Sequence, residues 1–582
     1  MNQKIIIGLL TAIVVIMGIF LFKSEFRDEN FSSFHNRMMG GNNFSENKVP
    51  FEGYSKQMAA HCSMMPEMPG CEKYTALASK STNVAVENKT DSSDISNLAS
   101  AKKAEIIELK NGDTYTMEVT KVKKEIGNKE VQMLAYNGSI PGPVIKVAQN
   151  SEITLKFINK VPDLETTLHS HGLRLDNAFD GVPVDMMGKQ KVLKYGESFE
   201  YKLKFPDAGI YWYHPHVAED MQQAMGLYGN YLVEPTGDNY WSKVNREETL
   251  VLDDILMDND KIEKFSSSFS NYVLMGRYGN TMMINGDTAY TLNAKKGEVL
   301  RMYFTNVSNT RPYNIHIPGA KIKLVGGDNG KYEKETFIEN FTIAPAERYV
   351  VDVYFPDSGT FEIQNITPVS KYTLGKVVVS NEKIKNSYKG EFDTLRTNKD
   401  VISDIDKFRP YFDKPVDKNL TLSLGHKGMK GGMGGGMMGG MNMGNEQNDD
   451  GIEREDSMQA MNKNSNSNTL QWKILEDNTG KENMDINWKF KVGDKVKIKI
   501  YNDPNSMHPM QHPIHFHGQR FLVISRNGVA QTNLVWKDTT LIKKGETVEI
   551  LVDMNNPGDW MSHCHIAEHL MSGMMMHFVV EK

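Results

Sequence analysis

The sequence predicts an all-β protein made of three consecutive β-sandwich domains that follow an N-terminal membrane segment. At 582 residues the chain is too long for a single hydrophobic core. From about residue 104 onward, short runs of alternating apolar and polar residues are separated by Gly, Pro and Asn, which is typical of β-sandwiches. One strand motif also recurs three times, at 150–159, 297–306 and 493–502, which indicates repeated domains.

Residues 1–23 are predicted to be an export segment. Lys4 precedes eighteen uncharged, mostly apolar residues, Ile5 to Phe22, which suffice for one membrane span at ~1.5 Å per residue. Charged residues follow directly and no small-x-small cleavage signal ends the run, so we expect an uncleaved anchor rather than a removed signal peptide. The chain is therefore expected to be exported, periplasmic or extracytoplasmic, and anchored to the cytoplasmic membrane by residues 5–22.

Residues 24–103 are polar and lack sustained periodicity, which is typical of a tether with little fixed structure. One island, residues 61–71, combines His61, Cys62, Cys71 and three methionines. In an oxidising compartment the two cysteines could form a disulfide. Because soft sulfur ligands prefer Cu(I), the island could equally bind that ion.

The repeats define the three domains, with limits 104–240, 245–385 and 395–582. Each copy of the strand motif begins with a turn and continues with three apolar residues two apart. A histidine follows ten residues after the closing Asn of each copy: His169, His316 and His512. Near the end of each domain, Gly209, Gly359 and Gly558 are followed five residues later by His214, Gln364 and His563.

The middle domain is predicted to hold no metal. Gln364 replaces the histidine of its siblings, and no His-x-His pair accompanies it or His316. We therefore expect domain two to be a structural spacer, with His316 as a packing residue, and domains one and three to share the metal.

An insert at 425–468 interrupts the third domain. Its first half is rich in Gly and Met, so it cannot bury a core and should be mobile. Thioethers bind Cu(I), which makes the segment a candidate for Cu(I) recruitment, and a flexible linker without a specific role is the alternative. The candidate ligands are Met429, Met433, Met437, Met438, Met441 and Met443.

The C-terminal stretch 563–574 combines the ligands of two kinds of metal site. Successive side chains of a strand alternate faces, so His563 and His565 should point one way and Cys564 the other. Cys564, His569 and Met574 follow at intervals of five and supply a thiolate, an imidazole and a thioether, most of a blue-copper site.

Such a site needs one more histidine, which is expected in the segment 512–517. Together with 169–171, 214–216 and 563–569, this segment holds ten of the sixteen histidines.

These motifs resemble those of the three-domain multicopper oxidases, including bacterial laccase-like and copper-resistance cuprous oxidases, over residues 104–582. The resemblance implies cupredoxin-like (plastocyanin-like) Greek-key domains and four copper ions, one type 1, one type 2 and two type 3. It implies a type 1 copper on His512, Cys564, His569 and axial Met574, and a type 2 copper on His169 and His515. The type 3 pair would take His171, His214, His216, His517, His563 and His565.

The resemblance also implies the reaction, in which one-electron oxidation of a donor drives four-electron reduction of O₂ to water. A thioether axial ligand implies a modest potential, which suits Cu(I) and its detoxification. The alternatives are a laccase-like oxidase of phenols or other reduced metal ions, and a copper-sequestering protein without turnover. The net charge of −6 gives no support for nucleic-acid binding. Expected partners are O₂, Cu(I) or a small reduced donor, and the membrane, and the chain is expected to be a monomer.

O₂ reduction consumes protons, so a carboxylate relay is expected near the metal. Asp180, eleven residues after His169, matches the acid that the family carries in domain one. Leu570 stands where many bacterial relatives carry a glutamate, so a second acidic relay is in doubt, and the adjacent Glu568 is a weak substitute.

Overall fold

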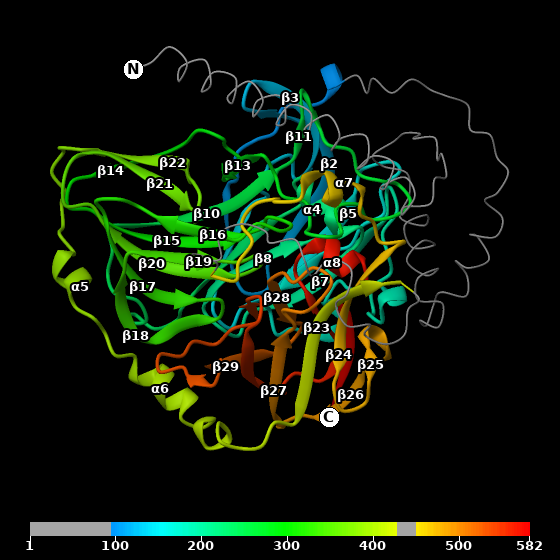
Figure 1. Ribbon diagram of the computed structural model, residues 1–582. Coiled ribbons are helices and arrows are strands. Elements are labelled where there is room, and N and C mark those ends of the chain that lie inside the picture. The colour runs from blue at the N-terminus through cyan, green and yellow to red at the C-terminus, as the bar shows by residue number, and fades with distance from the viewer. Residues whose placement is uncertain (1–94, 428–449) are drawn as a thin grey trace, which may run out of the picture. The chain divides into compact units, whose positions relative to one another are not determined.

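The computed structural model describes residues 95–427 and 450–582 (Figure 1). The chain divides into two units, 1–49 and 50–582, and all described residues belong to the second. The predicted anchor at 5–22, the island at 61–71 and the six methionines from Met429 to Met443 lie outside the described residues. Within the described residues, no helix is both long and apolar enough to cross a membrane.

The prediction of an all-β chain is confirmed, because sheets dominate each domain. Domain one pairs a five-stranded sheet, in the order β1-β4-β9-β8-β6, with a four-stranded sheet, in the order β3-β2-β5-β7. Its strands are β1 (Ile106–Leu109), β2 (Thr114–Ile126), β3 (Lys129–Tyr136), β4 (Val144–Ala148), β5 (Glu152–Asn159), β6 (His169–His171), β7 (Ser198–Lys204), β8 (Gly209–His214) and β9 (Gly229–Glu234). The short helix α4 (Glu219–Ala224) follows β8.

Domain two, green in Figure 1, pairs a six-stranded sheet with a five-stranded one. The larger sheet contains β13 (Thr281–Ile284), β10 (Arg246–Ile255), β15 (Val299–Asn306), β20 (Arg348–Tyr354), β17 (Lys321–Gly327) and β18 (Gly330–Ile338). The smaller contains β14 (Tyr290–Lys295), β22 (Lys371–Ser380), β21 (Gly359–Ile366), β16 (Tyr313–His316) and β19 (Asn340–Ile343).

Domain three pairs a seven-stranded sheet with a five-stranded one. The larger sheet contains β25 (Lys481–Glu482), β24 (Leu470–Glu476), β23 (Lys418–His426), β27 (Lys495–Asn502), β32 (Thr547–Asp553), β29 (Arg520–Arg526) and β30 (Val529–Ala530). The smaller contains β26 (Asn487–Lys491), β34 (Met575–Glu581), β33 (Gly558–Cys564), β28 (His512–Phe516) and β31 (Thr539–Ile542). Helix α8 (Ala567–Met571) lies between β33 and β34.

The recurring sequence motif forms β5, β15 and β27, which occupy the same place in their three sheets. Each pairs in parallel with an earlier strand, β2, β10 or β23, and antiparallel with a later one, β7, β20 or β32. In β5 the apolar residues Ile153, Leu155 and Phe157 are buried while their neighbours are partly or fully exposed. In β5 the period of two therefore directs one face into a core, whereas β15 is buried on both faces.

The pairing of β-strands also corrects the predicted alignment of the third repeat. His169 lies opposite His214 in domain one, and His316 lies opposite Gln364 in domain two. In domain three His515, not His512, lies opposite His563. His515 follows the closing Asn502 by thirteen residues, whereas His169 and His316 follow their closing Asn by ten. The residue that aligns with His512 in domain two is Tyr313, because each begins its strand and pairs with an Ile.

The second half of the insert is ordered. Helix α7 (Gln459–Asn464) holds Asn462, whose side chain accepts from Met275 N at 3.0 Å and donates to Gly276 O at 2.9 Å. Met458 and Met461 pack against the core of domain three. Met458 and Met461 therefore attach this half of the insert to domain three.

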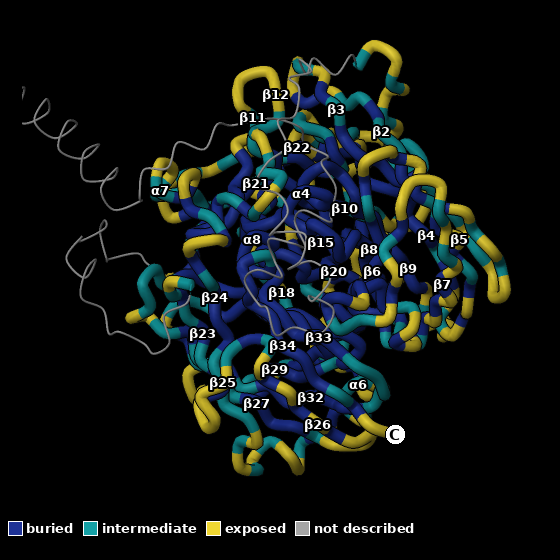
Figure 2. Tube along the Cα trace, turned by 90° about the vertical axis from the view of Figure 1, so that its right-hand side faces the viewer, coloured by how far each residue is buried: buried dark blue, intermediate teal, exposed yellow. Residues whose placement is uncertain are grey.

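The strands that carry the histidine pairs of domains one and three are almost entirely buried. In Figure 2 strands β6, β8 and β33 are dark blue over most of their length, whereas yellow is confined to turns and outer edges. Domains one and three bring these strands together, so the histidines of both meet in a region closed to solvent.

Candidate metal centre

The first cluster joins His512, Cys564 and His569. The Sγ atom of Cys564 lies 3.6 Å from His512 Nδ1 and 3.8 Å from His569 Nδ1, and the two nitrogens are 3.3 Å apart. An ion equidistant from the three atoms would lie about 2.1 Å from each, which is a metal–ligand bond length. The three side chains therefore form a preorganised trigonal metal site.

Local packing holds this geometry. The ring of Trp472 stacks on His569 at 4.1 Å between centroids and meets His512 edge-on at 4.7 Å. The loop after β33 closes back on itself, because Cys564 N donates to Met574 O at 3.1 Å and Met574 N donates to His569 O at 3.0 Å. Met574 is fully buried in this loop.

Burial raises the pKa of the Cys564 thiol, so without metal the thiol stays protonated. A metal ion would displace the proton on binding. A trigonal site of two histidines and one thiolate, with a methionine in the same loop, is the set that suits copper.

The second cluster contains eight histidines, each at most 1 % exposed. They form three groups, within each of which the candidate ligand atoms lie within 4.8 Å of one another, and the first two groups share His171. The groups are His169, His171 and His515; His171, His214 and His565; and His216, His517 and His563. Domain one supplies four of these residues and domain three the other four, so neither domain can build the cluster alone.

Hydrogen bonds on the outer ring nitrogens fix the tautomers of six of these histidines. Backbone carbonyls accept from His169 at 2.6 Å, from His214 at 3.0 Å, from His515 at 2.9 Å and from His563 at 2.9 Å. Carboxylates accept from His171 at 3.0 Å and from His517 at 2.9 Å. The other ring nitrogen of each residue then carries a lone pair, and those of His517 and His563 lie 3.0 Å from each other.

The inner nitrogens fit metal ions. Buried ring nitrogens without a hydrogen-bond partner include those of His169, His171, His214, His216, His515 and His565. Burial and the neighbouring imidazoles lower the pKa of His171, His214, His216, His515 and His563, so these rings stay neutral. So many buried polar atoms without partners destabilise the folded state unless an ion occupies the space between them. Neutral imidazole is a ligand that suits copper.

Strand β33 connects the two clusters. Cys564 belongs to the first cluster, while its neighbours His563 and His565 belong to two different groups of the second. The alternation of side chains along a strand produces this division, because adjacent residues face opposite sides of a sheet.

Asp180 lies against the second cluster. It is 3 % exposed, its Oδ2 accepts from His517 Nδ1 at 2.9 Å and its backbone oxygen accepts from His169. Burial raises its pKa, but His517 and His169 outweigh that effect and hold the pKa of Asp180 below its usual range. Asp180 therefore stands beside the histidines as a carboxylate.

The sequence analysis missed Glu219. This residue opens α4, three positions after His216, and is 1 % exposed. Its carboxylate lies 3.8 Å from ring nitrogens of His214, His216 and His565, so it reaches two groups of the second cluster. Burial and the nearby Asp220 and Glu568 raise the pKa of Glu219 well above its usual value. In the sequence, only its position three residues after the His214–His216 pair indicated that Glu219 could lie near the cluster.

Glu568 points to domain two. Its carboxylate accepts from Asn309 Nδ2 at 2.9 Å and from Thr310 Oγ1 at 3.1 Å, and burial raises its pKa to about 7. Leu570 is buried in the core that domain one shares with domain three. The doubt about a second relay acid at these two positions therefore stands, and Glu219 is the better-placed carboxylate.

Domain two, although predicted to be a spacer, contributes Arg348 to the second cluster. Its Nη1 donates to Asp538 Oδ1 in domain three at 2.7 Å, and its Nε donates to Ile210 O in domain one at 3.1 Å. Asp538 Oδ1 accepts from His171 Nε2 at 3.0 Å, and its backbone oxygen accepts from His515. Arg348 and Asp538 are fully buried, so one residue of domain two fixes Asp538, whose carboxylate orients His171 and whose backbone oxygen orients His515.

No triad of His, Cys, Asp and Glu with metal-binding spacing lies inside domain two within the described part of the chain. His316 is partly exposed and its Nδ1 donates to Glu339 O at 2.9 Å.

Sequence models described as "Multicopper oxidase" match residues 117–238, 246–379 and 452–582. The chain is 26 % identical to "Multicopper oxidase mco" of Staphylococcus aureus over 480 residues, covering 81 % of this chain and 89 % of that protein. It is also 26 % identical to "Copper resistance protein A" of Escherichia coli over 287 residues, covering 42 % and 46 % of the two chains. The structure is similar to a "Multicopper oxidase from Campylobacter jejuni: a metallo-oxidase", with a TM-score of 0.61 and 24 % identity over 84 % of this chain and 98 % of that one.

The Arg348→Met variant should bind copper more weakly at the second cluster and leave the first intact. Loss of an outer-shell partner typically lowers metal affinity ~10–100-fold. We expect chelator titration to remove copper from the second cluster at a lower chelator concentration than in wild type, while the thiolate absorption of the first cluster is unchanged.

Arg301→Met is the matched control, because Arg301 is 2 % exposed and binds Asp352 through two nitrogens inside domain two. Both variants break a buried ion pair, which costs about 3–5 kcal/mol in free energy of unfolding. Equal copper retention in the two variants would contradict a positioning role for Arg348.

Proposed function

Because the chain belongs to the multicopper oxidase family, we propose that it oxidises Cu(I) to Cu(II) in copper detoxification and reduces O₂ to water. The observation that carries this proposal is the arrangement along β33, which places Cys564 in one cluster and its two neighbours in the other. A donor site and an oxygen site joined by one covalent segment are what the coupled reaction requires.

The proposed division of copper follows the clusters. Type 1 copper is assigned to His512, Cys564, His569 and Met574, and type 2 copper to His169 and His515. The type 3 pair is assigned to His171, His214, His216, His517, His563 and His565. The four ions, when bound, would supply one-electron oxidation at the first cluster and four-electron reduction of O₂ at the second.

The residues of the chain perform three further tasks. The peptide between Cys564 and His563 provides the connection between clusters, and His563 Nδ1 donates to Cys564 O at 2.9 Å within it. The complete burial of both clusters excludes bulk water, which strengthens every electrostatic interaction inside. Asp180, held as a carboxylate against His517, is the proposed relay for the protons that O₂ consumes.

Two features favour Cu(I) as the donor. Met574 offers the first cluster a thioether, which is consistent with a modest potential. The methionine-rich segment offers soft ligands close in sequence to β23 and β24 of the same domain. The likeness to a protein named for copper resistance points the same way.

A laccase-like oxidation of phenols or other reduced metal ions is the second candidate, because both reactions use the same clusters. A copper-sequestering protein is disfavoured, since storage does not require eight histidines arranged around an oxygen site. We also propose an extracytoplasmic location with an anchor at residues 5–22, because these residues are uncharged and mostly apolar.

Replacing Met429, Met433, Met437, Met438, Met441 and Met443 with serine should lower Cu(I) oxidation selectively. If these thioethers deliver Cu(I), we expect kcat/KM for Cu(I) to fall by at least about tenfold, while kcat/KM for a phenol changes little. Both are measured as O₂ consumption by protein with full copper content.

The control changes six glycines of the same segment to serine and keeps the methionines. Failure of the wild-type protein to consume O₂ with Cu(I) would contradict the proposed donor, and equal losses with Cu(I) and phenol would contradict the recruitment role.

The Asp180→Asn variant should slow reoxidation by O₂. Asparagine keeps the size of the side chain and an oxygen that can accept from His517, but it cannot carry a proton. A general acid or base typically contributes ~10²–10⁴-fold, so stopped-flow reoxidation of the reduced enzyme should slow by that order while reduction by the donor stays near normal.

Asp176→Asn, four residues earlier in the same turn and exposed, is the control, because its side chain only caps Ala178 N at 2.9 Å. Reoxidation of the Asp180 variant within about threefold of wild type would refute the relay.

A further inference from the structure

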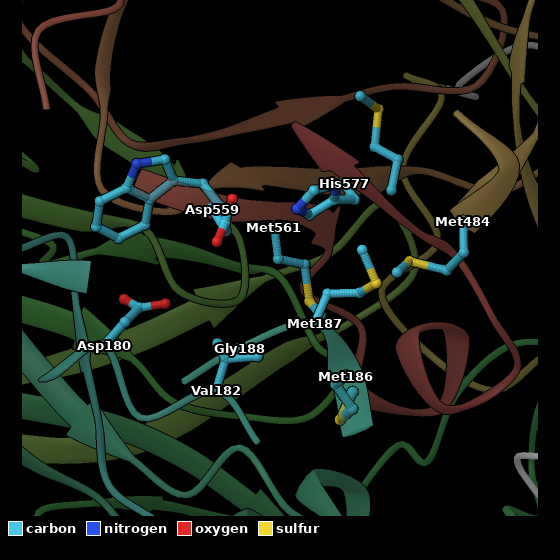
Figure 3. Close-up of a pocket in the computed structure, with 11 residues that line it drawn as sticks. Asp180, Val182, Met186, Met187, Gly188, Met484, Asp559, Met561 and His577 are labelled. Atoms are coloured by element: carbon cyan, nitrogen blue, oxygen red, sulfur yellow. The ribbon is translucent and has the colours of Figure 1, made fainter. Parts of the chain in front are cut away.

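A narrow pocket lined by methionines lies between domains one and three, outside both histidine clusters (Figure 3). Domain one contributes the turn that follows η3 (Val184–Met186), and domain three contributes β33, β34 and η6 (Asn483–Asp485). The free space is about 10 Å³, which is room for one ion or one water molecule. The sulfur-bearing walls are Met186, Met187, Met484, Met561 and Met576.

Three thioethers and an imidazole converge in this pocket. Met561 and His577 are directly opposite each other in the β33–β34 pair, so both side chains leave the sheet on one face. Figure 3 shows the thioether ends of Met187, Met484 and Met561 pointing toward one another beside the ring of His577. Met187 and Met484 are partly exposed, whereas Met561 is 4 % exposed, so the pocket runs from the surface inward.

His577 is an unexplained buried polar side chain. It is 6 % exposed, and neither of its ring nitrogens has a hydrogen-bond partner. Burial lowers its pKa, so the ring is neutral and offers a lone pair. Buried polar groups are normally hydrogen-bonded, and a bound ligand is one way to satisfy such a group.

Packing alone does not account for these features. Methionine often fills irregular gaps in a core, and Met576 is part of the core of domain three. A gap filler would not need an unpartnered imidazole at its centre. Met187 also has a φ of +67°. This left-handed conformation is energetically unfavourable for any residue that has a side chain.

We propose that this pocket is a separate binding site for a soft monovalent metal ion, with Met187, Met484, Met561 and His577 as its ligands. Thioether and imidazole ligands favour Cu(I) over Cu(II) or Zn²⁺, and the two carboxylates that line the pocket, Asp180 and Asp559, already contact His517 and Lys189. The choice of Cu(I) among soft ions rests on the proposed function, whereas the existence of the site does not.

The inner wall of the pocket is Asp180, which accepts from His517 in the second cluster. The outer rim carries Lys189 and Asp559, which form an ion pair across the domain boundary. An ion in this pocket would therefore be held between solvent and the carboxylate that borders the second cluster. This position suits a site that binds copper before the ion is transferred to the buried histidines.

Silver(I) is the probe, because it resembles Cu(I) in ligand preference and is not oxidised by the enzyme. Copper-loaded protein is titrated with Ag(I), and bound silver is counted by mass spectrometry. The double variant Met187→Leu/Met484→Leu, which keeps side-chain volume and removes two sulfur atoms, should bind one silver ion fewer than wild type.

The matched control is Met257→Leu/Met282→Leu, which changes two partly buried methionines of the second-domain region that do not line the pocket. It should bind as much silver as wild type. His577→Phe provides a second test from another strand and should also lose one equivalent. Unchanged blue absorption and copper content in all variants report that the fold and both clusters are intact.

Anomalous scattering from a silver-soaked crystal locates the ion, and a peak among Met187, Met484, Met561 and His577 is expected. Equal silver binding by wild type and both pocket variants, or a crystal without silver in the pocket, would overturn the site. Silver in the pocket of a protein that does not oxidise Cu(I) would uphold the site and overturn the proposed donor instead.

Discussion

The burial of uncharged imidazoles with free inner nitrogens is the constraint on which the rest of the structure depends. A buried polar atom without a partner costs free energy, and here many such atoms face one another in a region closed to water. The protein supports this arrangement by satisfying the outer nitrogens with backbone carbonyls and carboxylates, so that each lone pair points inward. Metal binding and folding are therefore coupled, because bound copper offsets the free-energy cost of these unpartnered nitrogens and the metal-free fold does not.

The local chemistry of the site could be predicted from sequence, whereas its long-range support could not. The His-x-His pairs, Cys564 and Met574 lie in short motifs whose spacing reflects the alternation of a strand. Asp538 and Arg348 are 190 residues apart, and no periodicity connects them to His171. The alignment of the third repeat was wrong because the residue opposite His563 is His515, thirteen residues after Asn502 instead of ten, and a fixed count from the closing Asn cannot detect that difference. Glu219 was missed because a glutamate at the start of a helix normally needs no functional explanation.

The three domains are less independent than their sheets imply. Domains one and three provide the histidines, but the carboxylate that orients His171 is fixed by a residue of domain two. Domain two, which holds no metal-binding triad among the described residues, instead links the two histidine-bearing domains through Arg348. The methionine pocket uses the same interface, so one junction between domains contains both the second histidine cluster and the proposed site for a soft metal ion.

The central claim is that Cys564 joins a donor site to an oxygen site, and Cys564→Ser tests it most directly. Copper content, blue absorption and O₂ consumption are measured on the same preparation of wild type and variant. Serine removes the only thiol of the first cluster but leaves all eight histidines of the second, so the variant should lose the blue absorption and turnover and keep the copper of the second cluster. A variant that retained both colour and O₂ consumption would contradict the account.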